Sequence, residues 1–171
     1  MNTVPELIAA LDDALPGVGL TLHTDPDAPV HKPWRQLAKE VRAAADGLRA
    51  FKGQPVLVPM ESDVDLIVGF LGLICAGALP YLVRPYLFGA SSLEYRRFLG
   101  ALSERFDVTA ILETPSLEGL DIPLRRIRPA AGDPAAPLPP VDPQTLAFVQ
   151  FSSGSTAAPK GVPITHQRLL Q

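Results

Sequence analysis

Residues 147–170 read AFVQFSSGSTAAPKGVPITHQRLL, and this stretch decides how the rest of the chain is interpreted. The apolar run at residues 146–151 predicts a strand, and a second run at residues 162–165 predicts another. Between them, residues 152–161 contain four hydroxyl side chains, two glycines and one lysine. Such a loop suits a polyphosphate, because backbone N–H groups and hydroxyls donate hydrogen bonds to its oxygens and the lysine adds a positive charge.

The lysine of this loop has unusual neighbours for a phosphate-binding lysine. Lys160 lies between Pro159 and Gly161, whereas a Walker A loop has glycine before its lysine and serine or threonine after it. The loop is therefore predicted to return into a strand and not to open a helix. An ordinary Ser/Gly-rich hairpin with one solvated lysine has the same composition, so the order of the residues carries the interpretation.

That order resembles the phosphate-binding signature of the adenylate-forming superfamily, which includes acyl-CoA synthetases, peptide-synthetase adenylation domains and fatty acyl-AMP ligases. The family pattern runs Ser/Thr, Ser/Gly, Gly, Ser/Thr, Thr/Ser, Gly, any residue, Pro, Lys, Gly. The positions that fit it in register are Ser152, Ser153, Gly154, Ser155, Thr156, Pro159, Lys160 and Gly161. Upstream, residues 74–80 (ICAGALP) match most of the family's Leu-x-x-x-Ala-Gly-Ala-x-Pro stretch, so the resemblance spans residues 30–171.

Two details refine the resemblance. Ala157 stands where a third glycine is usual, which leaves open either a positive φ or the closest backbone approach to phosphate at this point. The lead-in at residues 148–153 (FVQFSS) and the segment 164–166 (ITH) are most similar to the fatty acyl-AMP ligase branch.

The resemblance implies a two-step reaction. A carboxylic acid, here expected to be a fatty acid, attacks the α-phosphate of ATP accompanied by Mg²⁺, giving acyl-AMP and pyrophosphate. The thiol of CoA or of an acyl carrier protein then accepts the acyl group. On the family pattern the ATP phosphates are bound by Ser152, Ser153, Gly154, Ser155, Thr156, Lys160 and Gly161. Lys160 is the expected catalytic residue, which stabilises the charge of the departing pyrophosphate.

The three histidines receive no chemical role. His166 is expected to start a helix or to pack, and His23 and His31 lie outside any cluster with zinc-ligand spacing. No metal site on the protein is therefore predicted.

The composition of the chain limits the kinds of protein that it can be. The chain has 171 residues, 47% of them hydrophobic and 19% charged, as expected for one globular domain with a core. Its net charge of −3 and its lack of a basic run argue against a nucleic-acid partner. One cysteine cannot form an internal disulfide, and no signal peptide is evident, so a cytoplasmic location is expected.

One segment imitates a membrane span. Residues 66–83 contain no charged side chain and reach the lower length limit for a transmembrane helix. A helix start at Ser62, Asp63 and Asp65, and a helix end at Gly77 before Pro80, instead divide the segment into a helix and a strand. No membrane span is therefore expected. Cys75, on this helix, is expected to be a buried small hydrophobe.

The remaining pattern favours an α/β fold with a doubly wound, mainly parallel sheet flanked by helices. Apolar periodicity predicts helices at residues 2–15, 34–51, from 63, and 91–104, and strands at 20–23, 55–59, 79–83 and 108–112. Residues 55–83 thus form a strand–helix–strand unit, and a second one follows. Gly69 and Gly72 are expected to let the intervening helix pack closely on the sheet.

Residues 125–143 interrupt this rhythm with six prolines, too many for a helix or a central strand. An extended linker at 128–143 is expected to lead into a phosphate-loop hairpin at 146–166. No later family motif follows, so residues 1–171 are expected to be part of the N-terminal subdomain of an adenylating enzyme, inactive alone and prone to self-association at its open sheet edge.

Two alternatives stay open at this point. One is a non-catalytic docking or binding module of a larger synthase. The other is a phosphate-binding protein of unrelated fold whose loop matches by chance, which a non-parallel topology around residues 146–165 would favour.

Overall fold

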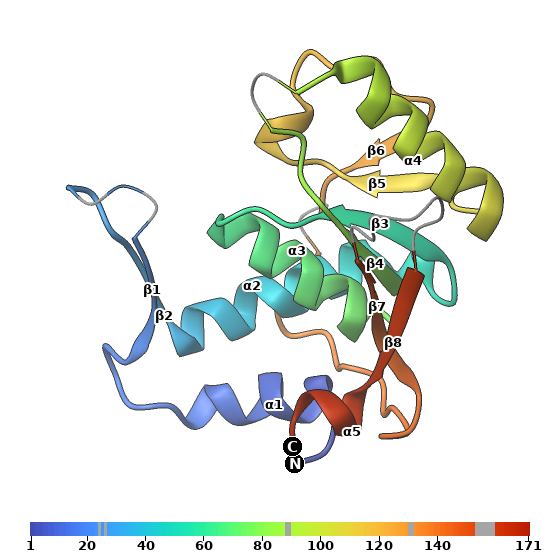
Figure 1. Cartoon of the computed structure of the whole chain (residues 1–171). Helices are drawn as coiled ribbons and strands as arrows, with labels where there is room; N and C mark the ends of the chain where they lie inside the picture. Colours follow the sequence, from blue (N-terminus) through green and yellow to red (C-terminus); the bar gives the residue numbers. More distant parts are fainter. Residues whose placement is uncertain (24, 26, 88–89, 130–131, 153–159) are drawn as a thin grey trace.

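The computed structural model describes residues 1–171 except 24, 26, 88–89, 130–131 and 153–159. A six-stranded sheet forms its centre, with helices on both faces (Figure 1). The helices are α1 (Val4–Ala10), α2 (Trp34–Gly47), α3 (Val64–Cys75), α4 (Ser92–Phe106) and α5 (His166–Leu169), with 3-10 turns η1 (Leu11–Asp13), η2 (Arg49–Phe51) and η3 (Pro115–Leu117). The strands are β1 (Gly19–Leu22), β2 (Val30–Pro33), β3 (Pro55–Pro59), β4 (Leu79–Val83), β5 (Ala110–Leu112), β6 (Arg125–Ile127), β7 (Leu146–Ser152) and β8 (Lys160–Thr165).

The main sheet has the strand order β6-β5-β3-β4-β7-β8. Every neighbouring pair is parallel except the last, in which β8 runs antiparallel to β7. The chain winds from β3 through α3 to β4, and then returns through α4 to β5 on the other side of β3. Because α3 and α4 lie on opposite faces, the predicted doubly wound α/β fold is confirmed (Figure 1).

Two apolar clusters hold the layers together, one on each face of the sheet. On one face α1, α2 and α3 cover Val56 and Val58 of β3, and on the other face α4 covers Leu57. Successive side chains of a strand point to opposite faces, so a run such as PVLVP must be apolar throughout when both faces are covered. This burial explains why β3 and β4 were predicted with the bounds that the structure shows.

Side-chain caps fix where the helices begin. The Oδ1 atom of Asp63 accepts from the backbone N–H groups of Asp65 (2.6 Å) and Leu66 (3.3 Å) at the start of α3. Ser91 caps α4 in the same way through the N–H of Glu94. These contacts satisfy donors that the first turn of a helix otherwise leaves free. Helix α4 ends at Asp107, the one described non-glycine residue with positive φ, at 52°.

The glycines of α3 allow two different close contacts. A Cβ on Gly69 would lie 2.9 Å from Cδ2 of Leu112 in β5, so this glycine faces the sheet as predicted. A Cβ on Gly72 would lie 2.7 Å from the Cβ of Ala44, so this glycine instead admits α2.

Cys75 near the end of α3 is fully buried. Burial raises the pKa of its thiol to about 12, since the thiolate would lose its solvation. The prediction of an inert, buried small hydrophobe is therefore confirmed. Within the residues that the structure describes, no helix is long and apolar enough to cross a membrane.

Three differences from the predicted elements concern short or polar segments. The expected helix at residues 2–15 is shorter, with α1 and η1 ending at Asp13 and Leu15 exposed. Strand β2 was not predicted; it pairs antiparallel with β1 in a separate two-stranded sheet. The irregular segment expected at residues 125–143 begins instead with the edge strand β6, which pairs parallel with β5 before the prolines begin. Each missed strand obtains its hydrogen bonds from a neighbour that its own sequence does not reveal.

Candidate functional site

The described strands that flank the sequence-predicted site are β7 and β8, at the edge of the sheet. Strand β7 is tied to the core by parallel pairing with β4, and β8 pairs with β7 alone among the described strands. Ser152 and Lys160 are the last antiparallel pair, so they face each other where the loop begins and ends. Because β7 runs parallel to β3, β4 and β5, this pair lies at the carboxyl edge of the sheet (Figure 1).

The structure locates part of the predicted phosphate-binding set. Ser152 ends β7, Lys160 opens β8, and Gly161 follows within that strand. Lys160 therefore returns into a strand and not into a helix, as its neighbours Pro159 and Gly161 predicted. The other predicted site residues, Ser153, Gly154, Ser155 and Thr156, lie outside the described residues. Ala157 and Pro159 also lie outside them.

Aromatic packing fixes the base of the hairpin tip. The ring of Phe151 lies 5.4 Å from that of Tyr81 on β4 and 5.1 Å from that of Phe106 on α4, measured between centroids. Gly161 pairs with Phe151 in the ladder. A Cβ on Gly161 would lie 2.8 Å from Cγ1 of Val149 and 3.2 Å from Cε1 of Phe151. The glycine therefore lets these two buried side chains cross under β8.

The opposite face of the hairpin is open towards the tip. Lys160, Val162 and Ile164 alternate with Gly161 and Pro163 along β8, so they point to the face that carries α1, α2 and α3. Ile164 packs against that core, but Val162 is 51% exposed, and Lys160 and Gln150, the ladder partner of Val162, are also exposed. The cation of Lys160 thus lies at the carboxyl edge beside an exposed part of this face.

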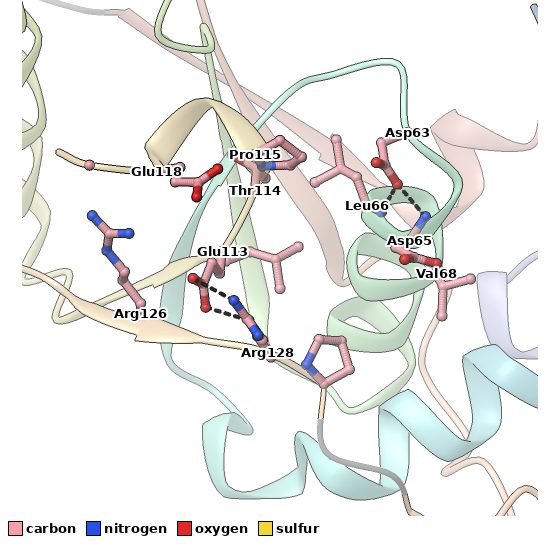
Figure 2. Close-up of a pocket in the computed structure, with 13 residues that line it drawn as sticks. Asp63, Asp65, Leu66, Val68, Glu113, Thr114, Pro115, Glu118, Arg126 and Arg128 are labelled. Carbon is pink, nitrogen blue, oxygen red and sulfur yellow. Dashed lines mark hydrogen bonds and ion pairs between the residues drawn. The ribbon is translucent and has the colours of Figure 1, made fainter. Parts of the chain in front are cut away.

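A separate crevice lies at the same edge, beyond β3 and β5 (Figure 2). Its volume is about 720 Å³, within the range of small-molecule sites. The winding of the sheet reverses between β3 and β5, and open α/β sheets bind ligands at such a point. The charged residues that line it are Asp63, Asp65, Glu113, Glu118, Arg126 and Arg128.

Several charged groups of this crevice already have partners, either each other or the backbone. Nε and Nη2 of Arg128 donate to the carboxylate of Glu113 at 2.6 and 2.9 Å (Figure 2). The hydrogen bonds from Arg128 lower the pKa of Glu113 and in turn raise that of Arg128. Asp63 caps α3, and Arg126 donates to the carbonyl of Leu120. The crevice is thus a concave surface of mixed charge, and β4 lies between it and the hairpin.

His166 has a contact that the sequence did not predict. Its side chain is 2% exposed, and its Nδ1 accepts a hydrogen bond of 3.1 Å from the backbone N–H of Val4 in α1. The Thr-His pair was interpreted only as a helix start or a packing position. His166 does begin α5, with Thr165 as its N-cap, but it also joins the two ends of the described chain (Figure 1).

Among the described residues, no group of three or more His, Cys, Asp or Glu side chains is arranged to hold a metal ion.

Comparison with known proteins agrees with this geometry. The family model described as "AMP-binding enzyme" matches residues 21–171. The chain is 31% identical over 155 residues to a long-chain fatty acid–AMP ligase of Mycobacterium tuberculosis, covering 80% of this chain and 26% of that protein. It is 31% identical over 160 residues to phosphinothricin tripeptide synthetase PhsC of Streptomyces viridochromogenes, covering 85% of this chain and 14% of that protein.

A solved structure shows the same fold. The fatty acyl-adenylate ligase of L. pneumophila, in complex with acyl adenylate and pyrophosphate, matches with a TM-score of 0.77 at 20% identity, over 99% of this chain and 31% of that chain. The chain spans about a quarter or less of the length of the curated relatives it matches.

These matches remove one of the two open alternatives. A non-parallel topology around residues 146–165 would have favoured a chance loop match on an unrelated fold, whereas β7 is parallel to β4 and the family model covers most of the chain. The resemblance read from residues 152–161 is confirmed. The chain belongs to the AMP-binding enzyme family.

Proposed function

We propose that this chain supplies the triphosphate-binding hairpin of an enzyme that activates a carboxylic acid, of the fatty-acid class, with ATP. A carboxylate oxygen attacks the α-phosphorus, the bond from that phosphorus to the bridging oxygen breaks, and acyl-AMP and pyrophosphate form. A thiol of CoA or of an acyl carrier protein then attacks the acyl carbonyl, and AMP leaves. In this proposal residues 1–171 are part of an N-terminal subdomain, with a linker at 128–143 and the phosphate-loop hairpin at 146–166.

The observation that carries the proposal is the position of Lys160. Its side chain is exposed at the carboxyl edge, opposite Ser152 and at the end of a loop with the family's residue order. In the first step negative charge accumulates on the leaving pyrophosphate, so a fixed ammonium group at this point stabilises the transition state more than the ground state. Ser153, Ser155 and Thr156 are proposed to donate to the β- and γ-phosphates, and Gly154 to allow a close backbone approach.

Mg²⁺ is proposed to accompany the triphosphate and to neutralise part of its charge. The described residues contain no cluster of metal ligands. The hairpin's own contribution is therefore to bind and orient the phosphates through N–H, hydroxyl and ammonium donors.

The proposed acid substrate and thiol acceptor are inferred from the similar proteins and from two sequence segments. A fatty acid–AMP ligase and a peptide synthetase both match at 31% identity. The lead-in FVQFSS and the segment ITH favour the fatty acyl-AMP ligase branch, and a carrier-protein thiol is the acceptor that suits a synthase setting.

The first test measures phosphate binding by the 171-residue chain with tripolyphosphate as the probe. Loss of one charge-assisted contact in Lys160→Ala should weaken binding roughly 10- to 100-fold. Lys160→Arg should retain most of the affinity, and Lys39→Ala on the exposed side of α2 is the matched control for net charge. Equal affinities of Lys160→Ala and Lys39→Ala would exclude the hairpin as the phosphate site.

The second test measures reaction. In an enzyme that contains this chain and a complete acid site, ATP–pyrophosphate exchange across a series of carboxylic acids identifies the substrate. Lys160→Ala should slow that exchange on the order of 10- to 1000-fold, as for other removed transition-state donors. Absence of nucleotide binding together with binding of a carrier protein would support the docking-module alternative instead.

A further inference from the structure

His166 occupies a position from which it can control the phosphate-loop hairpin. It follows Thr165, the last residue of β8, and its imidazole is buried against the start of α1. The Nδ1 atom accepts from the N–H of Val4, so that nitrogen carries no proton and the proton of the neutral ring is on Nε2.

The donor in this contact needs an external partner. Val4 is the first residue of α1, and the initial N–H groups of a helix have no acceptor within the helix. The side chain of Thr3 accepts a hydrogen bond from the N–H of Glu6, and Nδ1 of His166 accepts the one from the N–H of Val4. Removal of the acceptor would leave a buried donor unpaired, which costs more than the hydrogen bond itself contributes.

Strand β8 also needs a fixed point at this end. Among the described strands it pairs only with β7, and the pairing changes register between Leu146 and Phe148, beside Thr165. A slip of one residue would transfer every side chain of β8 to the other face of the sheet, including that of Lys160. The backbone N–H of His166, which donates to Thr145 at 3.1 Å, and its imidazole together hold the strand against such a slip.

We propose that His166 is a positioning residue for the phosphate loop: its contact with Val4 locks the register of β8 and so keeps Lys160 opposite Ser152. The importance of Lys160 for phosphate rests on the proposed function, whereas the locking of β8 does not depend on it.

The experiment separates the effect of the hydrogen-bond acceptor at position 166 from the effect of side-chain volume. His166→Asn keeps an acceptor near the place of Nδ1 with a smaller side chain, and His166→Leu keeps apolar volume without an acceptor. Amide hydrogen exchange at Gly161, Val162 and Ile164 should become roughly 5- to 100-fold faster in His166→Leu and stay within a few-fold of wild type in His166→Asn. His31→Leu, which alters a histidine of the separate β1–β2 sheet, should leave β8 unchanged.

A reciprocal variant tests the same contact from its other side. Val4→Pro removes the donor, and proline suits the first position of a helix because the preceding Thr3 is already extended (φ −134°, ψ 154°). We expect Val4→Pro to accelerate exchange in β8 as His166→Leu does, and the double variant to be no worse than either single variant, since both remove one interaction.

Three outcomes would overturn the proposal. Amide exchange in β8 could keep its wild-type rate in His166→Leu, or it could be accelerated equally in His166→Asn and His166→Leu. The effects of His166→Leu and Val4→Pro on the exchange rate could also be strictly additive. Tripolyphosphate affinity is measured on the same variants. If wild-type chain does not bind the probe, the proposed function fails while the exchange data still decide the role of His166. If binding is normal but exchange is unaffected, only the positioning role fails.

Discussion

At the scale of single residues, the hairpin depends on a glycine without a Cβ as well as on aromatic side chains. Gly161 leaves room for Val149 and Phe151, since an added Cβ would lie 2.8 Å from a methyl group of Val149 and 3.2 Å from the ring of Phe151. The aromatic contacts of Phe151 with Tyr81 and Phe106 then anchor the strand that enters the loop. The glycine expected to serve phosphate therefore also serves packing.

Gly161→Ala should destabilise the chain by about 1–3 kcal/mol, the usual cost of overpacking, and should disturb the Phe151 ring. Urea unfolding measures the first effect and near-ultraviolet circular dichroism the second. Gly100→Ala is the matched control, because a Cβ there meets nothing within 4 Å in the interior of α4. It should stabilise the chain by ~0.4–1 kcal/mol. A neutral Gly161→Ala would contradict the packing role.

His166 gives the stability a dependence on pH. Burial lowers the pKa of His166 in the folded chain below its ordinary value of 6.5. The unfolded chain therefore binds more protons in this range, so stability is fully present above about pH 6.5 and falls as pH drops through the lowered folded pKa. Burial is the cause of this shift.

This pH effect can be measured by urea unfolding between pH 7.5 and about 5, a range above the carboxylates' titration. His166→Asn should flatten the curve there. The lowered pKa values of Glu6 and Glu113 act only further into acid, below 4.5, where stability is lost as they are protonated. An unchanged slope in His166→Asn would show that another group titrates.

The role of His166 was not predictable from the sequence for a physical reason. Its donor Val4 lies 162 positions away, and nothing in the order Thr-His-Gln indicates which backbone group will approach. Lys160, by contrast, could be proposed as a phosphate ligand from its immediate neighbours, because a phosphate loop is a local sequence pattern. Local chemistry was thus readable and long-range pairing was not.

At the scale of elements, the same division separates correct predictions from wrong ones. Strands β3 and β4 carry continuous apolar runs because both faces are covered, and their bounds were predicted without error. Strands β2 (VHKP) and β6 (RRI) have polar residues and edge positions, and they were missed. Their stability comes from pairing with β1 and β5, which is information that a short sequence window does not contain.

The cap of α3 was readable because its chemistry is local. Asp63→Ala should lower stability by ~0.5–2 kcal/mol, since the N–H groups of Asp65 and Leu66 lose their acceptor. Asp63→Asn should keep most of the stability, because its side-chain carbonyl can accept the same bonds. Thermal unfolding of both variants measures the difference. Equal losses in the two would indicate that charge at the helix start matters more than the acceptor.

At the scale of the whole molecule, the sheet has a covered interior and, at β8, an open edge. Strand β8 pairs only with β7 among the described strands, and Leu146 and Val162 on this hairpin are 41% and 51% exposed. An edge strand with free backbone groups and apolar side chains is a template for association. Lys160 and Gly161, two described residues of the proposed phosphate site, lie at the start of this edge strand.

The 171-residue chain by itself is expected not to form acyl-adenylate. One loop can bind an anion, but the reaction also requires the acid and the α-phosphate to be held in line, and loss of that positioning forfeits up to ~7–11 kcal/mol of acceleration. We also expect concentration-dependent self-association through the β8 edge. Sedimentation at several concentrations and ATP–pyrophosphate exchange over a panel of acids measure the two parts. Robust exchange by a strict monomer would refute both.

The single cysteine, buried at the end of α3, can report when the core of the folded chain opens. Cys75 is sealed by the core and its thiol is un-ionised at neutral pH, so a thiol-specific reagent should modify it only when α3 separates from α2 and the sheet. The rate of labelling then follows the opening equilibrium of the core, which can be timed in native buffer without denaturant. A fluorophore attached to a cysteine newly placed on the exposed face of β8 would report on the hairpin separately, with no competing surface thiol among the native residues.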